Sequence, residues 1–178
     1  MDDQTLQAAR RGDRDALGVL LRGLQDSWYR MSLSLLGTPD LAEDAAQETA
    51  IRFMRQLPGF RGESQLRTWS LGICLNVARE IRRWSACKAA SGADYAAADS
   101  ADPALSPEAS AMRIEGIRSL HEMLALLPER QREALVLRFF EEMSVEQTAE
   151  AMGCAPGTVK ATVHQALRAL RRKLEPLV

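Results

Sequence analysis

The chain has few of the residues from which stapled or metal-bound domains are built. Its 178 residues include three cysteines and two histidines. Cys74, Cys87 and Cys154 are widely spaced and form no C-x-x-C pair, which argues against a disulfide framework and against a zinc site made by this chain alone. His121 and His164 lack a convergent set of cysteine or acid partners in the sequence, and no glycine-rich phosphate loop occurs. We therefore expect no metal, no cofactor and no enzyme activity.

Long apolar runs are also lacking. Hydrophobic residues make up 46% of the chain and charged residues 26%, a balance typical of globular proteins. The longest apolar stretches are far shorter than a membrane-spanning helix, and no basic-then-apolar leader opens the sequence. These absences predict a cytoplasmic protein that does not insert into a membrane.

An excess of positive charge, the simplest sign of a nucleic-acid partner, is missing from the chain as a whole. Its net charge is −1. Residues 1–86 carry 12 basic against 11 acidic residues, and residues 113–178 carry 10 against 9. Residues 158–173, however, hold five basic residues and no acid. Local patches decide whether DNA is a plausible ligand, so this stretch is the first candidate site.

The composition changes sharply between residues 87 and 112. This stretch is rich in Ala, Ser, Asp, Gly and Pro, lacks apolar periodicity and holds one lysine against four acids. It predicts a flexible linker between one domain at 1–86 and another at 113–178. Both flanking segments are helical in pattern, and no segment alternates with period two. We expect an all-α protein with an N-terminal helical bundle, a linker and a C-terminal unit of shorter helices.

Residues 39–57 illustrate the helical pattern of the first domain. Gly37 and Pro39 stop one helix and start the next. The apolar residues of the second of these helices fall on roughly one face: Leu41, Ala45, Ile51, Met54 and Leu57.

The end of the chain has the grammar of a helix-turn-helix. Ser144 is a good N-cap for a helix ending at Met152, Gly153 can adopt the left-handed turn, and Pro156 suits the first turn of the next helix. In that last helix we expect a buried apolar stripe made of Val159, Val163, Ala166, Leu167, Leu170 and Leu174. Basic side chains step along another face and point outward, as on a recognition helix in the major groove. The alternative from the residues alone is an αα-hairpin with a solvated basic face.

Two longer segments then resemble one known family. Residues 127–174, which begin with Leu-Pro and hold Gly-Thr-Val-Lys at the start of the last helix, are similar to region four of bacterial sigma factors. Residues 40–84 resemble region two of the extracytoplasmic-function (ECF) group, through the acidic Asp-x-x-Gln-Glu stretch, the Phe-Arg-Gly-Glu-Ser loop and Thr-Trp. The resemblance implies a promoter-specificity subunit that binds core RNA polymerase and is controlled by an anti-sigma factor.

In the first domain the resemblance implies two sites. The polymerase-binding face would comprise Asp44, Gln47, Glu48 and Arg52. The downstream promoter element would be melted, and its single strand held, by Phe60, Arg61, Trp69, Asn76, Arg79, Arg82 and Arg83. Phe60, between two small or basic neighbours, looks exposed and would form the wall of a pocket for a flipped base, although a loop residue folded onto the core fits equally well.

In the second domain the resemblance implies reading of the upstream element as duplex DNA. The residues would be Thr158, Lys160, Ala161, His164, Gln165, Arg168, Arg171 and Arg172, of which the last arginines neutralise phosphates. The main alternative is a conventional helix-turn-helix transcriptional regulator whose first half is a sensor or dimerisation domain. An enzyme is a lesser alternative, and a pure protein-interaction module would leave the basic face unexplained.

Overall fold

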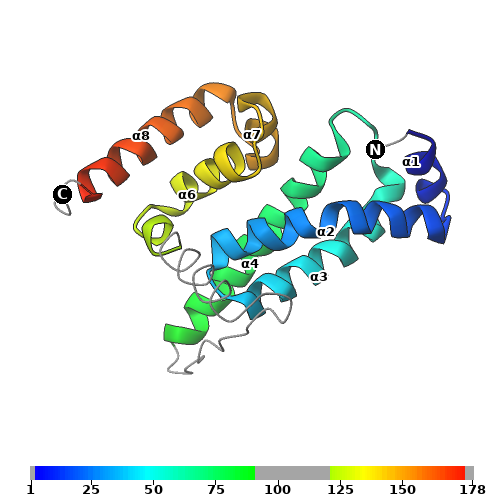
Figure 1. Cartoon of the computed structure of the whole chain (residues 1–178), viewed down its shortest axis with the longest axis horizontal. Helices are drawn as coiled ribbons and strands as arrows, with labels where there is room; N and C mark the ends of the chain where they lie inside the picture. The colour runs from blue at the N-terminus through cyan, green and yellow to red at the C-terminus, as the bar shows by residue number, and fades with distance from the viewer. Residues whose placement is uncertain (1–2, 91–120, 175–178) are drawn as a thin grey trace, which may run out of the picture.

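The computed structural model describes residues 3–90 and 121–174 of the chain. All regular structure within these two ranges is helical, so the expected all-α class is confirmed (Figure 1). We call residues 3–90 the first unit and residues 121–174 the second unit. In neither unit is a helix both long and apolar enough to cross a membrane.

Four α-helices and a short 3-10 turn make up the first unit. In chain order they are α1 (Asp3–Arg10), α2 (Arg14–Leu36), α3 (Pro39–Gln56), η1 (Leu57–Gly59) and α4 (Leu66–Ala90). The last of these helices corrects one boundary, because residues 87–90, expected to open the linker, continue α4. Residues 91–112, the rest of that linker, lie outside the described residues.

Local signals account for the helix ends. The Asp13 side chain accepts a hydrogen bond from the Ala16 amide at 2.9 Å and so caps α2. Gly37 ends the same helix with φ of +83°, a left-handed conformation that glycine adopts without strain. Pro39 stands in the first turn of α3, where its missing N–H costs nothing. The chain therefore turns sharply from α2 into α3, and the two helices pack side by side.

Aromatic rings form the centre of the first unit. Trp28 of α2 is fully buried, and its indole N–H donates to the hydroxyl of Ser70 on α4 at 3.2 Å. The Trp28 ring lies 5.3 Å from Phe53 of α3, and Phe53 lies 5.6 Å from Trp69 of α4. Tilted rings at these separations are favourable beyond the area they bury. These contacts hold α2, α3 and α4 together at one level of the bundle.

The second unit begins with helical residues 121–125. They are followed by α6 (Glu129–Leu135), the π-helical turn η2 (Val136–Phe140), α7 (Val145–Met152) and α8 (Pro156–Leu174). Arg132 of α6 donates to the carbonyls of Leu124 and Leu127 at 2.9 and 3.2 Å, which ties the first helical turn to α6.

The expected helix-turn-helix geometry is present in α7 and α8. Ser144 and Gln147 form a reciprocal capping box at the start of α7, with hydrogen bonds of 3.1 and 2.7 Å. Gly153 closes α7 with φ of +66°, and α8 then runs outward (Figure 1). Val159 and Ala166 anchor α8 to the rest of the unit and are fully buried.

The two units share one hydrophobic core. The buried cluster continues from Leu20 and Trp28 in the first unit, through Leu71 of α4, to Ala149 and Val159 in the second. Helix α7 packs against α4, and η2 packs against α2. The second unit therefore lies against the face of the first unit that α4 presents.

Candidate nucleic-acid interface

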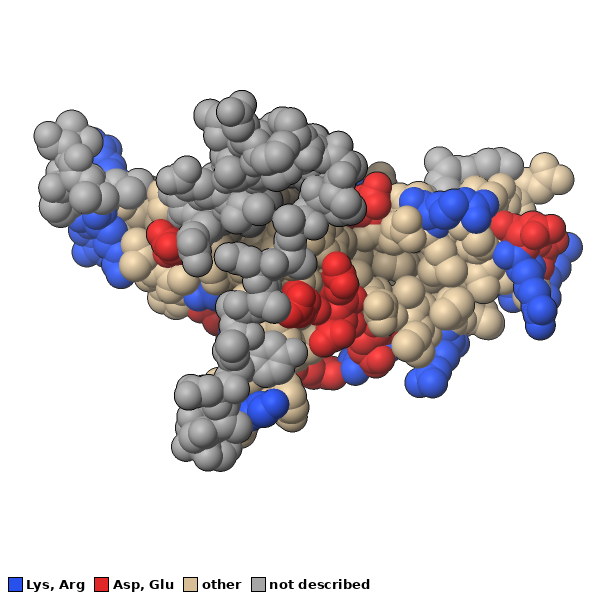
Figure 2. Space-filling view, turned by 60° about the horizontal axis from the view of Figure 1, so that its bottom comes forward, with Lys and Arg blue, Asp and Glu red and all other residues tan. Residues whose placement is uncertain are grey.

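The residues expected to read duplex DNA lie on one side of α8. At 100° per residue they cover roughly half of the helix circumference, opposite the buried Val159 and Ala166. All eight are exposed: Thr158, Lys160, Ala161, His164, Gln165, Arg168, Arg171 and Arg172. Basic side chains lie at the end of the molecule where α8 ends and also at the opposite end, and acidic side chains gather in the middle of the same face (Figure 2). The positive charge is therefore gathered in patches, one of them on α8, although the chain is nearly neutral.

One member of the expected apolar stripe does not belong to it. Leu167 is 48% exposed, whereas its neighbour Ala166 is fully buried. The reason is geometric, because Leu167 is turned about 100° around the helix from Ala166, which is buried where α6 and α7 pack against α8. Leu167 thus borders the basic face of α8.

The expected polymerase-binding residues lie on the outer side of α3. Asp44 and Gln47 are exposed, and Glu48 and Arg52 are partly buried. Arg52 contacts Glu48 at 2.7 Å and forms a double hydrogen bond with Glu80 of α4 at 2.8 and 2.7 Å. These carboxylates raise the pKa of Arg52, and the Arg52 guanidinium lowers the pKa of Glu80. Arg52 therefore links α3 to α4 while Asp44 and Gln47 point to solvent.

Two apolar residues join this outer side of α3. Ile51 and Met54 are 39% and 38% exposed, whereas Ala45 and Leu57 are buried, so the apolar residues of α3 do not share one face as expected. The buried face is made by Ala42, Ala45, Thr49 and Phe53. Ile51 and Met54 fall one and two turns after Gln47, which gives the surface a mixed polar and apolar character.

Phe60 is a core residue: of the two alternatives for this side chain, the structure shows the one in which it folds onto the core. Only 5% of its surface is accessible, and its ring lies 4.9 Å from Trp69. The residue follows η1, and its backbone N–H donates to the Leu57 carbonyl at 3.1 Å, so the chain turns inward at this point. Arg61 next to it is exposed and contacts Glu63 at 3.7 Å. The loop presents Arg61, rather than the Phe60 ring, to solvent.

A cavity of about 340 Å³ lies between α4 and the end of α7. Its wall on the first unit includes Trp69, Asn76 and Arg79, three of the residues expected to hold the downstream strand. Its wall on the second unit includes Glu150 and Gly153. An aromatic ring, an amide and a guanidinium around one cavity are groups that can stack on a base, hydrogen-bond its edge and neutralise a phosphate.

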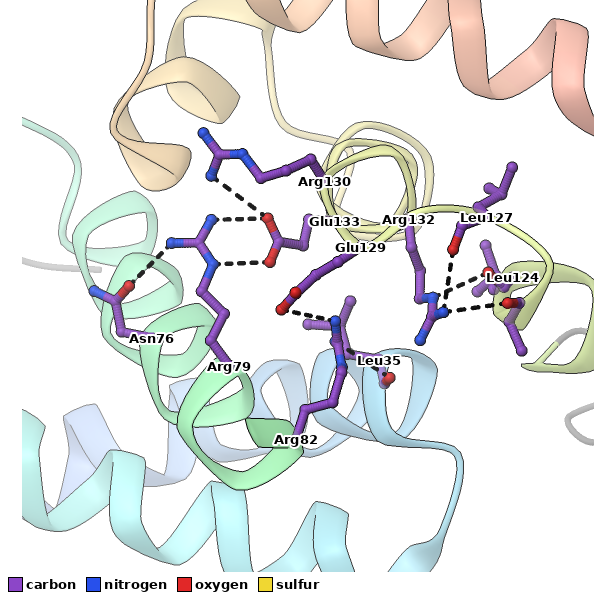
Figure 3. A network of polar contacts seen from close by, with 11 residues as sticks. Leu35, Asn76, Arg79, Arg82, Leu124, Leu127, Glu129, Arg130, Arg132 and Glu133 are labelled. Atoms are coloured by element: carbon purple, nitrogen blue, oxygen red, sulfur yellow. Dashed lines mark hydrogen bonds and ion pairs between the residues drawn. The ribbon is translucent and has the colours of Figure 1, made fainter. Parts of the chain in front are cut away.

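Arg79 at the edge of this cavity is held by a carboxylate of the second unit. Its Nε and Nη2 atoms donate to the two oxygens of Glu133 at 2.8 and 2.7 Å, and Nη1 donates to the Asn76 amide oxygen at 3.2 Å (Figure 3). The Glu133 side chain is fully buried. Hydrogen bonding to Glu133 raises the pKa of Arg79. A charge-assisted contact with two parallel hydrogen bonds is among the stronger polar interactions in proteins.

Arg82, one turn further along α4, makes a second contact with α6, the helix that carries Glu133. Its Nη1 atom lies 2.9 Å from a carboxylate oxygen of Glu129, and its Nη2 atom donates to the Leu35 carbonyl at 3.4 Å (Figure 3). Arg83 beside it is exposed. Of the three arginines expected to contact the downstream strand on α4, two therefore face α6 and one faces solvent.

Comparison with known proteins gives two family matches, in the order of the two units. Residues 20–85 match Sigma-70 region 2 and residues 117–170 match Sigma-70, region 4. The RNA polymerase sigma-H factor of Pseudomonas aeruginosa is 33% identical over 99% of this chain and 95% of its own length. The ECF RNA polymerase sigma factor SigW of Bacillus subtilis is 26% identical over 99% of this chain and 98% of its own length.

The chain belongs to the ECF sigma factor family. A solved structure of the sigma factor RpoE in complex with the anti-sigma factor NepR from Bartonella quintana has the same fold, with a TM-score of 0.66 at 24% identity. It covers 88% of this chain and 93% of that one. As a sigma factor, the protein is a promoter-specificity subunit of RNA polymerase, and its partners are the core enzyme and promoter DNA.

Sequence reasoning missed the acidic residues through which the second unit of this sigma factor contacts α4. Glu133 carried a usable signal, since it shares a helix face with the apolar Val136 and Leu137 and is buried with them. An acid in such a position needs a cationic partner. The sequence does not say which cation it meets, because Arg79 lies 54 residues earlier.

Proposed function

We propose that the two units divide promoter recognition between them. The domain at 1–86 binds core RNA polymerase and melts the downstream element, and the domain at 113–178 reads the upstream element as a duplex. The exposed basic face of α8 carries this proposal, because from Pro156 to Lys173 it has no acidic residue to repel phosphates. Lys160, Ala161, His164 and Gln165 face the bases and phosphates at the start of the helix, and Arg168, Arg171 and Arg172 neutralise the backbone.

Polymerase binds the outer side of α3 in this proposal. Asp44 and Gln47 supply polar contacts, and the exposed Ile51 and Met54 supply apolar area between and beyond them. Arg52 and Glu48 act by holding α3 on α4 through the contact with Glu80. Replacing Asp44 by Arg reverses a charge on a solvated surface, which changes affinity more than stability. We expect Asp44→Arg to lose core polymerase in a pull-down at unchanged helical content, while Asp26→Arg, an exposed site on α2, retains it.

The downstream strand enters the cavity beside α4. Trp69 stacks on a base, Asn76 hydrogen-bonds its edge, and Arg61, Arg79, Arg82 and Arg83 neutralise phosphates of the open strand. Phe60 supports the Trp69 ring from behind. We propose that strand opening uses this binding energy alone, without a cofactor or covalent chemistry, and that the protein works in the cytoplasm under the control of an anti-sigma factor. The fold shared with the NepR-bound sigma factor motivates the last point.

The experiment that tests this division is run-off transcription with core polymerase on a promoter selected by the holoenzyme from a random-sequence library. Lys160→Ala should weaken recruitment to a linear template and lower the slope of binding against salt by about one. Asn76→Ala should instead slow strand opening, and a pre-melted template should rescue it. Arg22→Ala removes an exposed positive charge from α2 and serves as the matched control.

Two outcomes would overturn the proposal. Equal salt slopes for Lys160→Ala and Arg22→Ala would remove the duplex-reading role of α8. Tight, sequence-specific binding of duplex DNA by the protein alone, without stimulation of transcription by core polymerase, would favour the conventional regulator.

A further inference from the structure

One of the three tryptophans lies outside both the hydrophobic core and the cavity. Trp28 is fully buried and Trp69 packs on Phe53 and Phe60, whereas Trp84 near the end of α4 is 57% exposed. No large apolar side chain that the structure describes is more exposed. A single exposed apolar residue is ordinary on a protein surface, so the surroundings of Trp84 decide whether its exposure has a use.

The residues around Trp84 are basic. Residues 82–88 contain two arginines and one lysine and no acid. Arg83, directly before Trp84, is exposed, and Nζ of Lys88 lies over the Trp84 ring, 4.9 Å from its centroid. A cation at this distance is attracted to the face of the ring and holds the ring in place. Since more than half of Trp84 is accessible although Lys88 lies over one face, an open aromatic surface stands beside two positive side chains.

The nearest acid in the sequence is Glu80, one turn before Trp84. Arg52 of α3 donates two hydrogen bonds to its carboxylate oxygens, at 2.8 and 2.7 Å. The guanidinium offsets the charge of Glu80, which would otherwise repel an anion from this end of α4. The surface around Trp84 therefore suits a ligand that carries negative charge.

Trp84 continues the side of α4 that lines the cavity. Asn76, Arg83 and Trp84 are all exposed, and Arg83 and Trp84 lie about 20° and 80° around the helix axis from Asn76. Trp84 is eight residues beyond Asn76, which is a rise of about 12 Å along the axis. Successive stacked bases of one strand are about 3.4 Å apart, so this rise spans about three to four bases. One strand can therefore reach Asn76 and Trp84 together.

A nucleic-acid strand fits this surface better than a protein partner does. Among residues 66–88 of α4, Trp84 is the one large apolar side chain that is exposed. The buried centre of a protein interface is more apolar than a single ring between charged side chains. An aromatic ring that offers a face to a base, with cations for the neighbouring phosphates, is the usual arrangement in proteins that hold single strands.

The position of Trp84 on α4 indicates which base it meets. The proposed function assigns the opened strand to Trp69 and Asn76, and it assigns the upstream duplex to the second unit, which follows α4 in the chain. The last turns of α4 then face the junction at which the opened strand rejoins its partner on the upstream side. A base at such a junction has lost one of its stacking neighbours, and an exposed ring can replace it.

We propose that Trp84 stacks on the base at the upstream edge of the opened region, while Arg83 and Lys88 neutralise the phosphates beside it. This inference rests on the proposed function, because the opened strand must lie along α4 to reach the ring. It adds a second aromatic contact to the one that Trp69 makes in the cavity.

Binding of the holoenzyme to fork-junction DNA tests the proposal. The probe, made from a promoter selected by the holoenzyme, is duplex through the upstream element and single-stranded beyond the junction. Trp84→Ala should bind this probe about fivefold to a hundredfold more weakly than the wild type, because stacking on the ring is lost. Trp84→Phe keeps a ring and should retain most of the affinity. Val19→Ala on α2 removes an apolar side chain that is 50% exposed, and it should bind like the wild type.

A series of probes with one abasic position each identifies the base that the ring contacts. Where the contacted base is missing, Trp84→Ala should cause no further loss of affinity, whereas at every other position the loss should persist. Such coupling reports a direct contact, and a general weakening of the protein would not produce it. The same series with Asn76→Ala should locate the base at Asn76, about three to four bases away.

The outcomes separate this proposal from the assignment of the downstream site. If Trp84→Ala lost the same affinity at every abasic position while Asn76→Ala was coupled to one of them, stacking at Trp84 would be wrong and the downstream site would stand. If neither variant was coupled to a position, both would be wrong. Loss of core polymerase by Trp84→Ala in a pull-down would make the ring a contact with the enzyme and overturn the proposal. Helical content should stay unchanged, since the residue is exposed and alanine favours the helix.

Discussion

Replacing Phe60 by alanine should unfold the first unit more easily, and the size of the effect decides what this ring does. The Phe60 residue is only 5% exposed, and its ring lies 4.9 Å from the ring of Trp69. Truncating a buried phenylalanine costs roughly 3–5 kcal/mol, and about 0.5–1.5 kcal/mol of that belongs to the lost aromatic pair. Since a whole protein is stable by about 5–15 kcal/mol, the loss is a large fraction of the total.

Urea unfolding followed by circular dichroism measures this cost. In a thermal melt of a chain of this length, a loss of 3–5 kcal/mol of stability corresponds to a fall in Tm of roughly 6–20 °C. Phe60→Leu keeps most of the volume and should cost less than about 1.5 kcal/mol. Both variants should transcribe from a pre-melted template like the wild type at temperatures where they are folded.

The opposite pattern would refute this reasoning. If Phe60→Ala lost less than about 1 kcal/mol of stability while open-complex formation collapsed, the ring would be part of the DNA site and not of the core. Stacking of a base on an aromatic ring is worth roughly 1–3 kcal/mol, so such a loss would be measurable by permanganate footprinting.

Four further predictions follow from individual side chains. Thr148 is fully buried and its hydroxyl has no hydrogen-bond partner, so Thr148→Val should raise the free energy of unfolding by about 1 kcal/mol in urea titrations. Gly37→Ala should lower it by about 1–3 kcal/mol or more, because φ is +83° and the new Cβ would lie 2.1 Å from Nε2 of His121; an unchanged Tm would contradict this. Burial lowers the pKa of His121 below 6.5, so the unfolded chain takes up a proton that the folded protein excludes. Stability should therefore fall as the pH drops from 6.5 to that lower pKa, and His121→Gln should flatten this part of the curve. Burial raises the pKa of the Cys74 thiol to about 11, so iodoacetamide at pH 8 should label the exposed Cys87 long before Cys74, as peptide mass spectrometry would report.

The sequence predicted those parts of the fold that depend on neighbouring residues. The turn at Gly37 and Pro39, the cap at Ser144 and the turn at Gly153 are all where local rules put them. The exposed side of α8 followed from helical periodicity, because the apolar and basic residues of that helix differ in phase. These signals act over one or two helical turns, and such signals can be recognised from a single sequence.

Features that depend on distant partners could not be predicted in this way. Phe60 turns inward because Trp69 offers it a ring to pack on, and nothing in the loop itself distinguishes that outcome from exposure. Ile51 and Met54 belong to the apolar pattern of α3, but in the structure they lie on its outer side. An apolar side chain is not by itself evidence of burial, so the pattern alone could not show this. The ion pair between Arg79 and Glu133 joins residues 54 positions apart, and several arginines were available to either acid.

The shared core has a consequence for how the molecule unfolds. The buried cluster runs without a break from Trp28 in the first unit to Ala166 in the second, so the two halves share part of their apolar interior. Heat or denaturant should then melt both halves in one cooperative step, with equal calorimetric and van't Hoff enthalpies. A lesion in the helix-turn-helix would make the distant α2 more open to proteolysis. In a cell, such a mutation would lower the amount of the whole protein rather than remove one contact with DNA.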